Sequence, residues 1–245
     1  MVKVSNLTKY YDELCAVNDL SFEVQAGEIL GFLGPNGAGK STTMKIITGF
    51  IAPSSGEASV DGHSILTDTV RAQKKIGYVP ENAPLYEELT VYDFLKFISR
   101  MREIAKDDIP NAIEDVIEKC SLQNVKHQYV GTLSKGFKRR VCLAQALIHN
   151  PDVLILDEPT DGLDPNQKHD VRNLIQSISK DKCIILSTHI LEEVEAVCTR
   201  AIILSEGEKK FDGTPQELKS KSTDGKLDDV FRAITLNQNV KGVQL

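Results

Sequence analysis

The sequence has no tryptophan, three methionines and few aromatic residues, and its five cysteines are scattered along the chain. Because Cys15, Cys120, Cys142, Cys183 and Cys198 form no CxxC pair, neither a disulfide framework nor a zinc site is indicated. We expect reduced thiols that serve mainly as buried packing residues, as in a cytosolic protein. No run of about 18 apolar residues occurs, so we predict that no transmembrane helix is present. If the protein serves a membrane, another chain spans it.

The charge balance is acidic, with a formal net charge of −6. A general nucleic-acid binder usually shows a basic face, so we expect no nucleic acid among the partners. The opening segment MVKVSNLTKYY alternates like a strand and lacks the charged start and apolar run of a signal peptide. With 41% hydrophobic residues in 245, the chain can build a sizeable core, which argues against bulk disorder.

The spacing of apolar residues divides the chain into regions with different predicted secondary structure. Residues 1–30 are predicted to form short strands, and apolar strands alternate with helices over 151–205, which is typical of a parallel sheet covered by helices. Residues from about 84 to 150 have helical spacing and no convincing strand. We therefore predict an α/β core with an inserted helical block, forming one domain over 1–220. A short extension, 221–245, holds a polar linker and the amphipathic stretch LDDVFRAITL.

The segment that follows the buried strand EILGFL carries the most specific motif. It opens a helix and matches G-x-x-x-x-G-K-[ST] at every position, through Gly34, Pro35, Asn36, Gly37, Ala38, Gly39, Lys40 and Ser41. Such glycines let backbone N–H groups face phosphates, and the helix N-terminus adds its positive dipole end. We expect Lys40 to reach the β- and γ-phosphates, Ser41 to help hold Mg²⁺, and Thr42 to lie in the same nucleotide site. A glycine-rich turn arising by chance would have to match eight positions in the right context.

Two strand ends supply the residues that chemistry on a phosphate requires. Asp157 and Glu158 follow the apolar strand VLIL, at the edge where open α/β sheets bind ligands. We predict that Asp157 ligates Mg²⁺ and that Glu158 orients or deprotonates the attacking water. His189 follows the apolar strand CIILST and is predicted to contact the γ-phosphate and that water. Taken alone, an acidic pair or a single histidine is more often a loop or surface residue, so both interpretations depend on the phosphate-binding motif.

Further segments resemble the ATPase subunits of ABC transporters. LSKGF at 133–137 resembles the signature motif, DGLD at 161–164 the D-loop, and IGYVPE at 76–81 the Q-loop. Tyr11 lies where that family stacks an aromatic ring on adenine. The resemblance spans about residues 2–215. LSKGF, combined with a glutamate at the end of the Q-loop, is most similar to the ATPases of ABC-2-type exporters, including the gliding-associated and multidrug branch.

The resemblance implies a P-loop NTPase (RecA-like) core with an N-terminal antiparallel β subdomain and an inserted α-helical subdomain. It implies ATP and Mg²⁺ as cofactors, with Ser134 and Gly136 contacting the nucleotide of a second subunit, either an identical copy or a related ATPase. Hydrolysis would drive separate integral-membrane permease subunits, with export favoured and this chain peripheral on the cytoplasmic face of the cell membrane. Part of the helical block would form the groove for a helix of that membrane partner.

Three positions depart from the family's pattern. Glu81 stands where glutamine is usual; its carboxylate can ligate Mg²⁺, but it adds negative charge beside Asp157 and Glu158. Lys135 replaces a glycine and either brings a cation near the phosphates or faces solvent. Phe137 replaces a glutamine and either loses a polar contact to the partner's nucleotide or packs against the helical block.

Two other classes of function stay open from the sequence. One is a soluble ABC ATPase that acts on a cytosolic assembly, such as iron–sulfur assembly, ribosomes or DNA ends. This chain resembles a single cassette, without the charged linker or the long coiled coils of the ribosome-acting and DNA-end relatives. The other is an ATP-dependent clamp with little hydrolysis, which the intact Lys40, Asp157, Glu158 and His189 disfavour.

Overall fold

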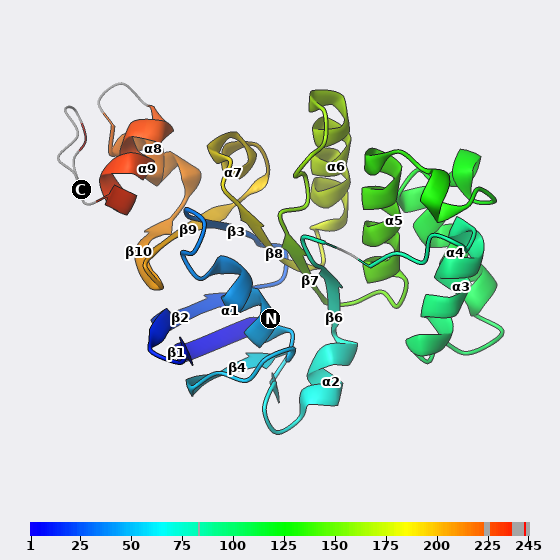
Figure 1. Ribbon diagram of the computed structural model, residues 1–245, viewed down its shortest axis with the longest axis horizontal. Helices are drawn as coiled ribbons and strands as arrows, with labels where there is room; N and C mark the ends of the chain where they lie inside the picture. The colour runs from blue at the N-terminus through cyan, green and yellow to red at the C-terminus, as the bar shows by residue number, and fades with distance from the viewer. Residues whose placement is uncertain (83, 223–225, 237–242, 244–245) are drawn as a thin grey trace.

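The computed structural model describes residues 1–82, 84–222, 226–236 and 243, and a six-stranded sheet lies at its centre (Figure 1). The order of this sheet is β10-β9-β3-β8-β7-β6. Its strands are β3 (Ile29–Leu33), β6 (Ile76–Val79), β7 (Val153–Asp157), β8 (Cys183–Thr188), β9 (Arg200–Ser205) and β10 (Glu208–Gly213). Neighbours from β9 to β6 are parallel, and β10 runs antiparallel to β9. Residues that follow β3, β6, β7 and β8 therefore meet at one edge of the sheet.

A second sheet, antiparallel and four-stranded, packs beside the first and holds the N-terminal residues (Figure 1). Its order is β2-β1-β4-β5, with β1 (Val2–Tyr11), β2 (Leu14–Val24), β4 (Ser55–Val60) and β5 (His63–Ser64). Asp61 and Gly62 form the turn between β4 and β5, with φ of 51° and 80°. Positive φ at both central residues is what a two-residue hairpin needs, so Asp-Gly suits this turn.

The described part of the chain contains nine α-helices. They are α1 (Lys40–Ile47), α2 (Thr69–Lys74), α3 (Val91–Met101), α4 (Ile109–Lys119), α5 (Lys135–Leu147), α6 (Pro165–Ile178), α7 (Leu191–Val197), α8 (Pro215–Ser220) and α9 (Leu227–Leu236). Residues 84–150, all of them described, hold α3, α4, α5 and two 3₁₀ turns, Gln123–Val125 and Val130–Thr132, without a strand. The predicted fold class, an α/β core with an antiparallel β subdomain and an inserted helical subdomain, is confirmed. The domain boundaries stay predictions.

The apolar residues of the central sheet pack into two separate hydrophobic cores, one on each face of the sheet. In β7, Val153 and Ile155 face the core shared with α1 and the antiparallel sheet, whereas Leu154 and Leu156 face the core shared with the helices. Because successive side chains of a strand point to opposite faces, a strand covered on both sides must be apolar at every position. This explains the uninterrupted run Val153–Leu156 that ends in polar residues.

Four cysteines, Cys120, Cys142, Cys183 and Cys198, are buried, and Cys15 is partly exposed. None of the five forms a disulfide. Burial raises the pKa of the Cys120, Cys183 and Cys198 thiols to about 12 and that of Cys142 to about 11. The four buried cysteines are therefore packing residues in their protonated form, as predicted. Among the residues described, no helix is both long and apolar enough to cross a membrane.

The C-terminal part holds two elements that were not predicted, β10 and α8. A capping box starts α8: Thr214 accepts a hydrogen bond from the Glu217 N–H, and the Glu217 carboxylate accepts one from the Thr214 N–H. The predicted stretch LDDVFRAITL forms α9, which packs on β9 and β10. In the predicted linker and tail, residues 223–225, 237–242 and 244–245 lie outside the described part.

Candidate active site

The loop between β3 and α1 has a backbone that only glycine can adopt at key positions. Gly37 and Gly39 have φ of 83° and 99°, in the left-handed region. A Cβ at Gly34 would lie 2.4 Å from the Leu204 carbonyl oxygen. No side chain caps the N-terminus of α1, so its first N–H groups remain available to an anion. The loop therefore fits a phosphate chain.

The carbonyl oxygen of Ala16, on β2, lies against this loop. A Cβ at Gly39 would be 2.4 Å from that oxygen, and a Cβ at Gly207, in the turn between β9 and β10, would be 3.0 Å from it. The antiparallel sheet and the central sheet therefore meet at the phosphate-binding loop.

The Lys40 side chain bends over the loop that precedes it. Its Nζ donates hydrogen bonds to the carbonyl oxygens of Gly34 (2.7 Å) and Pro35 (3.2 Å), and the residue is buried. Burial lowers the pKa of Lys40, while the nearby carboxylates, chiefly Glu158 and Asp157, act to raise it. An ammonium held between a phosphate-binding loop and carboxylates is placed to bind an anion.

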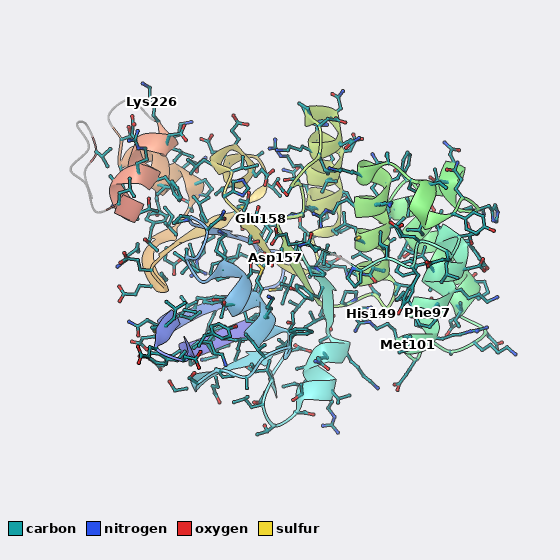
Figure 2. All side chains as sticks on the ribbon, in the orientation of Figure 1. Phe97, Met101, His149, Asp157, Glu158 and Lys226 are labelled. Atoms are coloured by element: carbon teal, nitrogen blue, oxygen red, sulfur yellow. The ribbon has the colours of Figure 1, made fainter. Side chains whose placement is uncertain are left out.

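Asp157 and Glu158 stand at the end of β7, near the centre of the molecule (Figure 2). Asp157 is buried, and its Oδ1 accepts hydrogen bonds from the hydroxyls of Ser41 (3.1 Å) and Ser187 (2.5 Å). The Ser187 hydroxyl in turn accepts the N–H of Glu158 at 3.0 Å. Glu158 has φ of 47°, an unusual conformation for a residue with a side chain, and such strain concentrates at functional sites.

His189 lies one residue beyond β8 and reaches Glu158. Its Nδ1 is 3.1 Å from Oε2 of Glu158, a pairing in which a protonated Nδ1 donates to the carboxylate. Glu158 is largely buried and His189 is about half exposed, with side-chain exposures of 13% and 49%. The ends of the adjacent strands β7 and β8 thus place the carboxylate of Glu158 and the imidazole of His189 in contact.

These groups line a cleft of about 470 Å³, within the range of small-molecule sites. The predicted residues on its wall are Tyr11, Asn36, Gly37, Ala38, Gly39, Lys40, Ser41, Thr42, Glu81, Glu158 and His189. Gly34, Pro35 and Asp157 lie behind this wall, in contact with Lys40 or Ser41. Leu14, Ala16 and Asp161 also line the cleft, and no motif in the sequence assigns Leu14 or Ala16 to it.

Ser134 and Gly136 do not line this cleft. Ser134 is the N-cap of α5, where its side chain accepts the N–H of Phe137, and it is exposed. Gly136 is buried, and a Cβ there would lie 2.7 Å from the side chain of Gln167. Lys135 is exposed, whereas Phe137 is partly buried against the helical core. The structure therefore leaves the N-terminus of α5 open to solvent and outside its own chain's cleft.

A buried carboxylate, Glu193 on α7, joins the segments that follow β7 and β8. It accepts hydrogen bonds from the hydroxyls of Thr160 and Thr188, the latter at 2.7 Å, and Arg172 lies 3.8 Å away. Thr160 precedes the cleft residue Asp161, and Thr188 precedes His189. The Nε of Arg172 is buried without a hydrogen-bond partner, so Glu193 supplies the opposite charge there.

Replacing this carboxylate should destabilise the fold. We expect Glu193→Ala to lower the free energy of unfolding by about 3 kcal/mol, because it leaves two buried hydroxyls and Arg172 without their acceptor. Urea unfolding followed by circular dichroism measures the change. Glu192→Ala, at the exposed neighbouring position, should shift it by less than about 0.5 kcal/mol. Equal stability of the two variants would contradict the role of Glu193.

A glycine-rich loop between β3 and a helix, a parallel sheet, and an acidic pair at the end of β7 define the class of P-loop nucleoside triphosphatases. The sequence profile of the ABC transporter family matches residues 17–161. The chain belongs to the ABC transporter family, and its cassette is the ATP-binding ATPase domain of that family.

Two relatives illustrate how much of a protein this chain represents. It is 38% identical over 218 residues to Nod factor export ATP-binding protein I of Burkholderia thailandensis, covering 89% of this chain and 72% of that protein. It is 39% identical over 227 residues to human ATP-binding cassette sub-family A member 2, covering 92% of this chain. The match spans 9% of that larger protein.

Solved structures share the whole architecture. An ATP-binding subunit of an ABC transporter has a TM-score of 0.84 at 29% identity, covering 96% of this chain and 99% of the other. The cassette MJ0796, solved as a dimer in a post-hydrolysis state with ADP and Pi, has a TM-score of 0.79 at 25% identity. That match covers 88% of this chain and 99% of the other.

Proposed function

We propose that this chain hydrolyses ATP as the motor subunit of an exporter, with two nucleotides held between two subunits. The observation that carries the proposal is the place of Ser134: it caps an exposed helix start, yet it lies outside the cleft that is lined by Lys40, Ser41, Glu158 and His189. A serine hydroxyl and a helix N-terminus bind phosphate well, and outside their own chain's cleft they would serve the nucleotide of a neighbouring subunit. Relatives named for Nod factor export favour an exporter, and the dimeric cassette MJ0796 supports the pairing.

The cleft residues have distinct roles in this proposal. The loop N–H groups and Lys40 bind the phosphates, and Tyr11, exposed at the end of β1, stacks on the base. Glu158 takes the proton of the attacking water, and the His189 ring holds the carboxylate through the contact between Nδ1 and Oε2. Ser187 donates to the Asp157 carboxylate and accepts the backbone N–H of Glu158, so it ties the Asp157 side chain to the Glu158 backbone.

We propose that Ser41, Asp157 and Glu81 provide the protein side of a Mg²⁺ site. The hydroxyl of Ser41 is 3.1 Å from Asp157, Glu81 lines the same cleft, and such hard oxygen donors suit Mg²⁺. No cluster of three or more His, Cys, Asp or Glu able to hold a metal occurs within the described residues, so phosphate and water would have to complete the shell. The ion, when bound, supplies positive charge to the phosphate oxygens.

The membrane partner is proposed to dock where α2 and α3 expose apolar side chains. Val70, Phe97 and Met101 are exposed there, and Phe97 and Met101 lie on the same side of the helical subdomain (Figure 2). Val70 and Met101 border a groove of about 400 Å³ that His149 also lines. Exposed apolar patches of this kind mark interaction sites. Such docking would place the chain peripherally on the cytoplasmic face of the membrane.

Phosphate release from MgATP by the purified chain tests the proposal. Because each site needs a second subunit, activity per molecule should rise with protein concentration until the dimer is saturated. Copurification with a polytopic membrane protein from detergent extracts supports transport, whereas copurification with cytosolic scaffolds alone supports a cytosolic assembly. No release at any concentration, with or without the copurified membrane protein, would indicate a clamp.

A further inference from the structure

Arg139 on α5 contacts both loops that flank the reacting end of the cleft. Its Nη2 donates to the carbonyl oxygen of Glu158 at 3.1 Å and lies 3.4 Å from that of Glu81. Its Nη1 lies 3.4 Å from the carbonyl oxygen of Pro80. One guanidinium thus connects the helical subdomain to two segments of the central sheet.

These carbonyl groups belong to neighbouring strand ends. Pro80 and Glu81 follow β6, Glu158 follows β7, and the two strands pair in parallel. A group that bridges them therefore fixes the separation between the predicted metal-binding side and the predicted base. No sequence pattern predicts this contact, because Arg139 is distant from both segments along the chain.

The peptide groups on either side of Glu158 are held from opposite directions. The N–H of Glu158 donates a hydrogen bond to the hydroxyl of Ser187, which lies on β8. The carbonyl oxygen of Glu158 accepts a hydrogen bond from Arg139, which lies on α5. Glu158 has a positive φ, which is disfavoured for a residue with a Cβ, so outside contacts must maintain this conformation. Arg139 is the contact that comes from the helical subdomain.

A guanidinium suits this position for a chemical reason. It has several N–H donors in one plane and stays charged, so it can bind carbonyl groups of different segments at once. A lysine ammonium is a single point donor on a flexible stem and can replace only part of this arrangement. The positive charge also lies close to a cleft that holds Glu81 and Glu158.

We propose that Arg139 is a positioning residue for hydrolysis, which makes the place of Glu158 depend on the place of α5. This inference rests on the proposed function. Ser134 is the N-cap of the same helix, and in the proposed function it serves the nucleotide of the neighbouring subunit. Engagement of Ser134 across the dimer fixes α5, and Arg139 carries that change to Glu158 in its own chain. The residue therefore connects one nucleotide site to the other.

Steady-state phosphate release by the full chain tests the inference with three variants. Arg139→Met should reduce kcat at least about tenfold, while KM for MgATP stays within about threefold, because the base is displaced and the phosphate-binding loop is not. Arg139→Lys should restore part of kcat. Lys138→Met is the control, because it removes one positive charge from the preceding position, where Lys138 forms an ion pair with Glu87 at 2.7 Å. This variant should keep kcat within about twofold of the wild type.

Failure of the proposed function and failure of the role of Arg139 give different results. A wild-type chain that releases no phosphate overturns the proposed function, and the role of Arg139 falls with it. An active wild type with an unchanged Arg139→Met, or an equal loss in Lys138→Met, overturns the inference alone. If Arg139→Met loses nucleotide binding, Arg139→Lys decides: a lower kcat at unchanged KM supports the proposal, and wild-type kcat overturns it.

Discussion

Glu158→Gln should reduce the turnover of MgATP by a factor of about 10²–10³, while the protein still binds the nucleotide. Glutamine keeps the size of the side chain and can still contact His189, whose Nδ1 lies 3.1 Å from the carboxylate. It cannot take a proton from water, so the bound nucleotide is not consumed. We therefore expect an ATP-bound dimer to accumulate, which size-exclusion chromatography with and without MgATP would show.

Glu206→Gln offers a matched control for this substitution. Glu206 also has a positive φ, of 53°, in the exposed turn after β9, but it does not line the cleft. Its substitution should leave turnover within about twofold of the wild type, as surface changes away from a site usually do. Unchanged hydrolysis in Glu158→Gln would remove Glu158 from the proposed role.

Mixing two inactive variants should restore activity if each site is shared between subunits. Lys40→Ala removes the cation that lies over the phosphate loop, and Ser134→Arg fills the exposed start of α5. In a dimer with one copy of each variant, both defects fall in one site and the other site is intact. Random pairing sets a ceiling of about a quarter of wild-type phosphate release, and the recovery should stay below this ceiling if Ser134 also acts on Glu158 of its own chain.

The control for this experiment is Lys45→Ala, which removes an exposed lysine from the same helix as Lys40. It should keep its activity and give no extra gain when mixed with Ser134→Arg. If the mixture of Lys40→Ala and Ser134→Arg stays at the level of its parents, either the two-subunit site or the independence of its two copies is wrong. Wild-type activity in Ser134→Arg alone would contradict the two-subunit site itself.

The phosphate-binding loop could be read from the sequence because its chemistry is local. Gly37, Gly39 and Lys40 act within a few residues, and the strand before them and the helix after them are contiguous. The buried strands were equally clear, because β7 and β8 are covered on both faces and are apolar until their last residues. The order of the strands and the contact between Glu158 and His189 needed the assembled sheet.

Residues that act through long-range contacts were not predictable. Ser187 is one polar residue near the end of an apolar strand, and its bridging of Asp157 and Glu158 depends on the pairing of β7 with β8. Arg139 lay in a basic run that carried no sign of a buried contact. The start of α8, in contrast, had a readable signal, since Thr214 and Glu217 have the spacing of a capping box.

The Ala16 carbonyl, held between Gly39 and Gly207, limits how this protein can diverge. A methyl group on either glycine would press on the same Ala16 carbonyl, so substituting one glycine would not make room for a side chain at the other. The number of residues from Tyr11, which we propose to contact the base, to Ala16, which lies against the phosphate-binding loop, is therefore locked to the geometry of the loop. A descendant that prefers another base would have to exchange side chains such as Tyr11 or Leu14, since inserting or deleting a residue in this hairpin would misplace the phosphates as well.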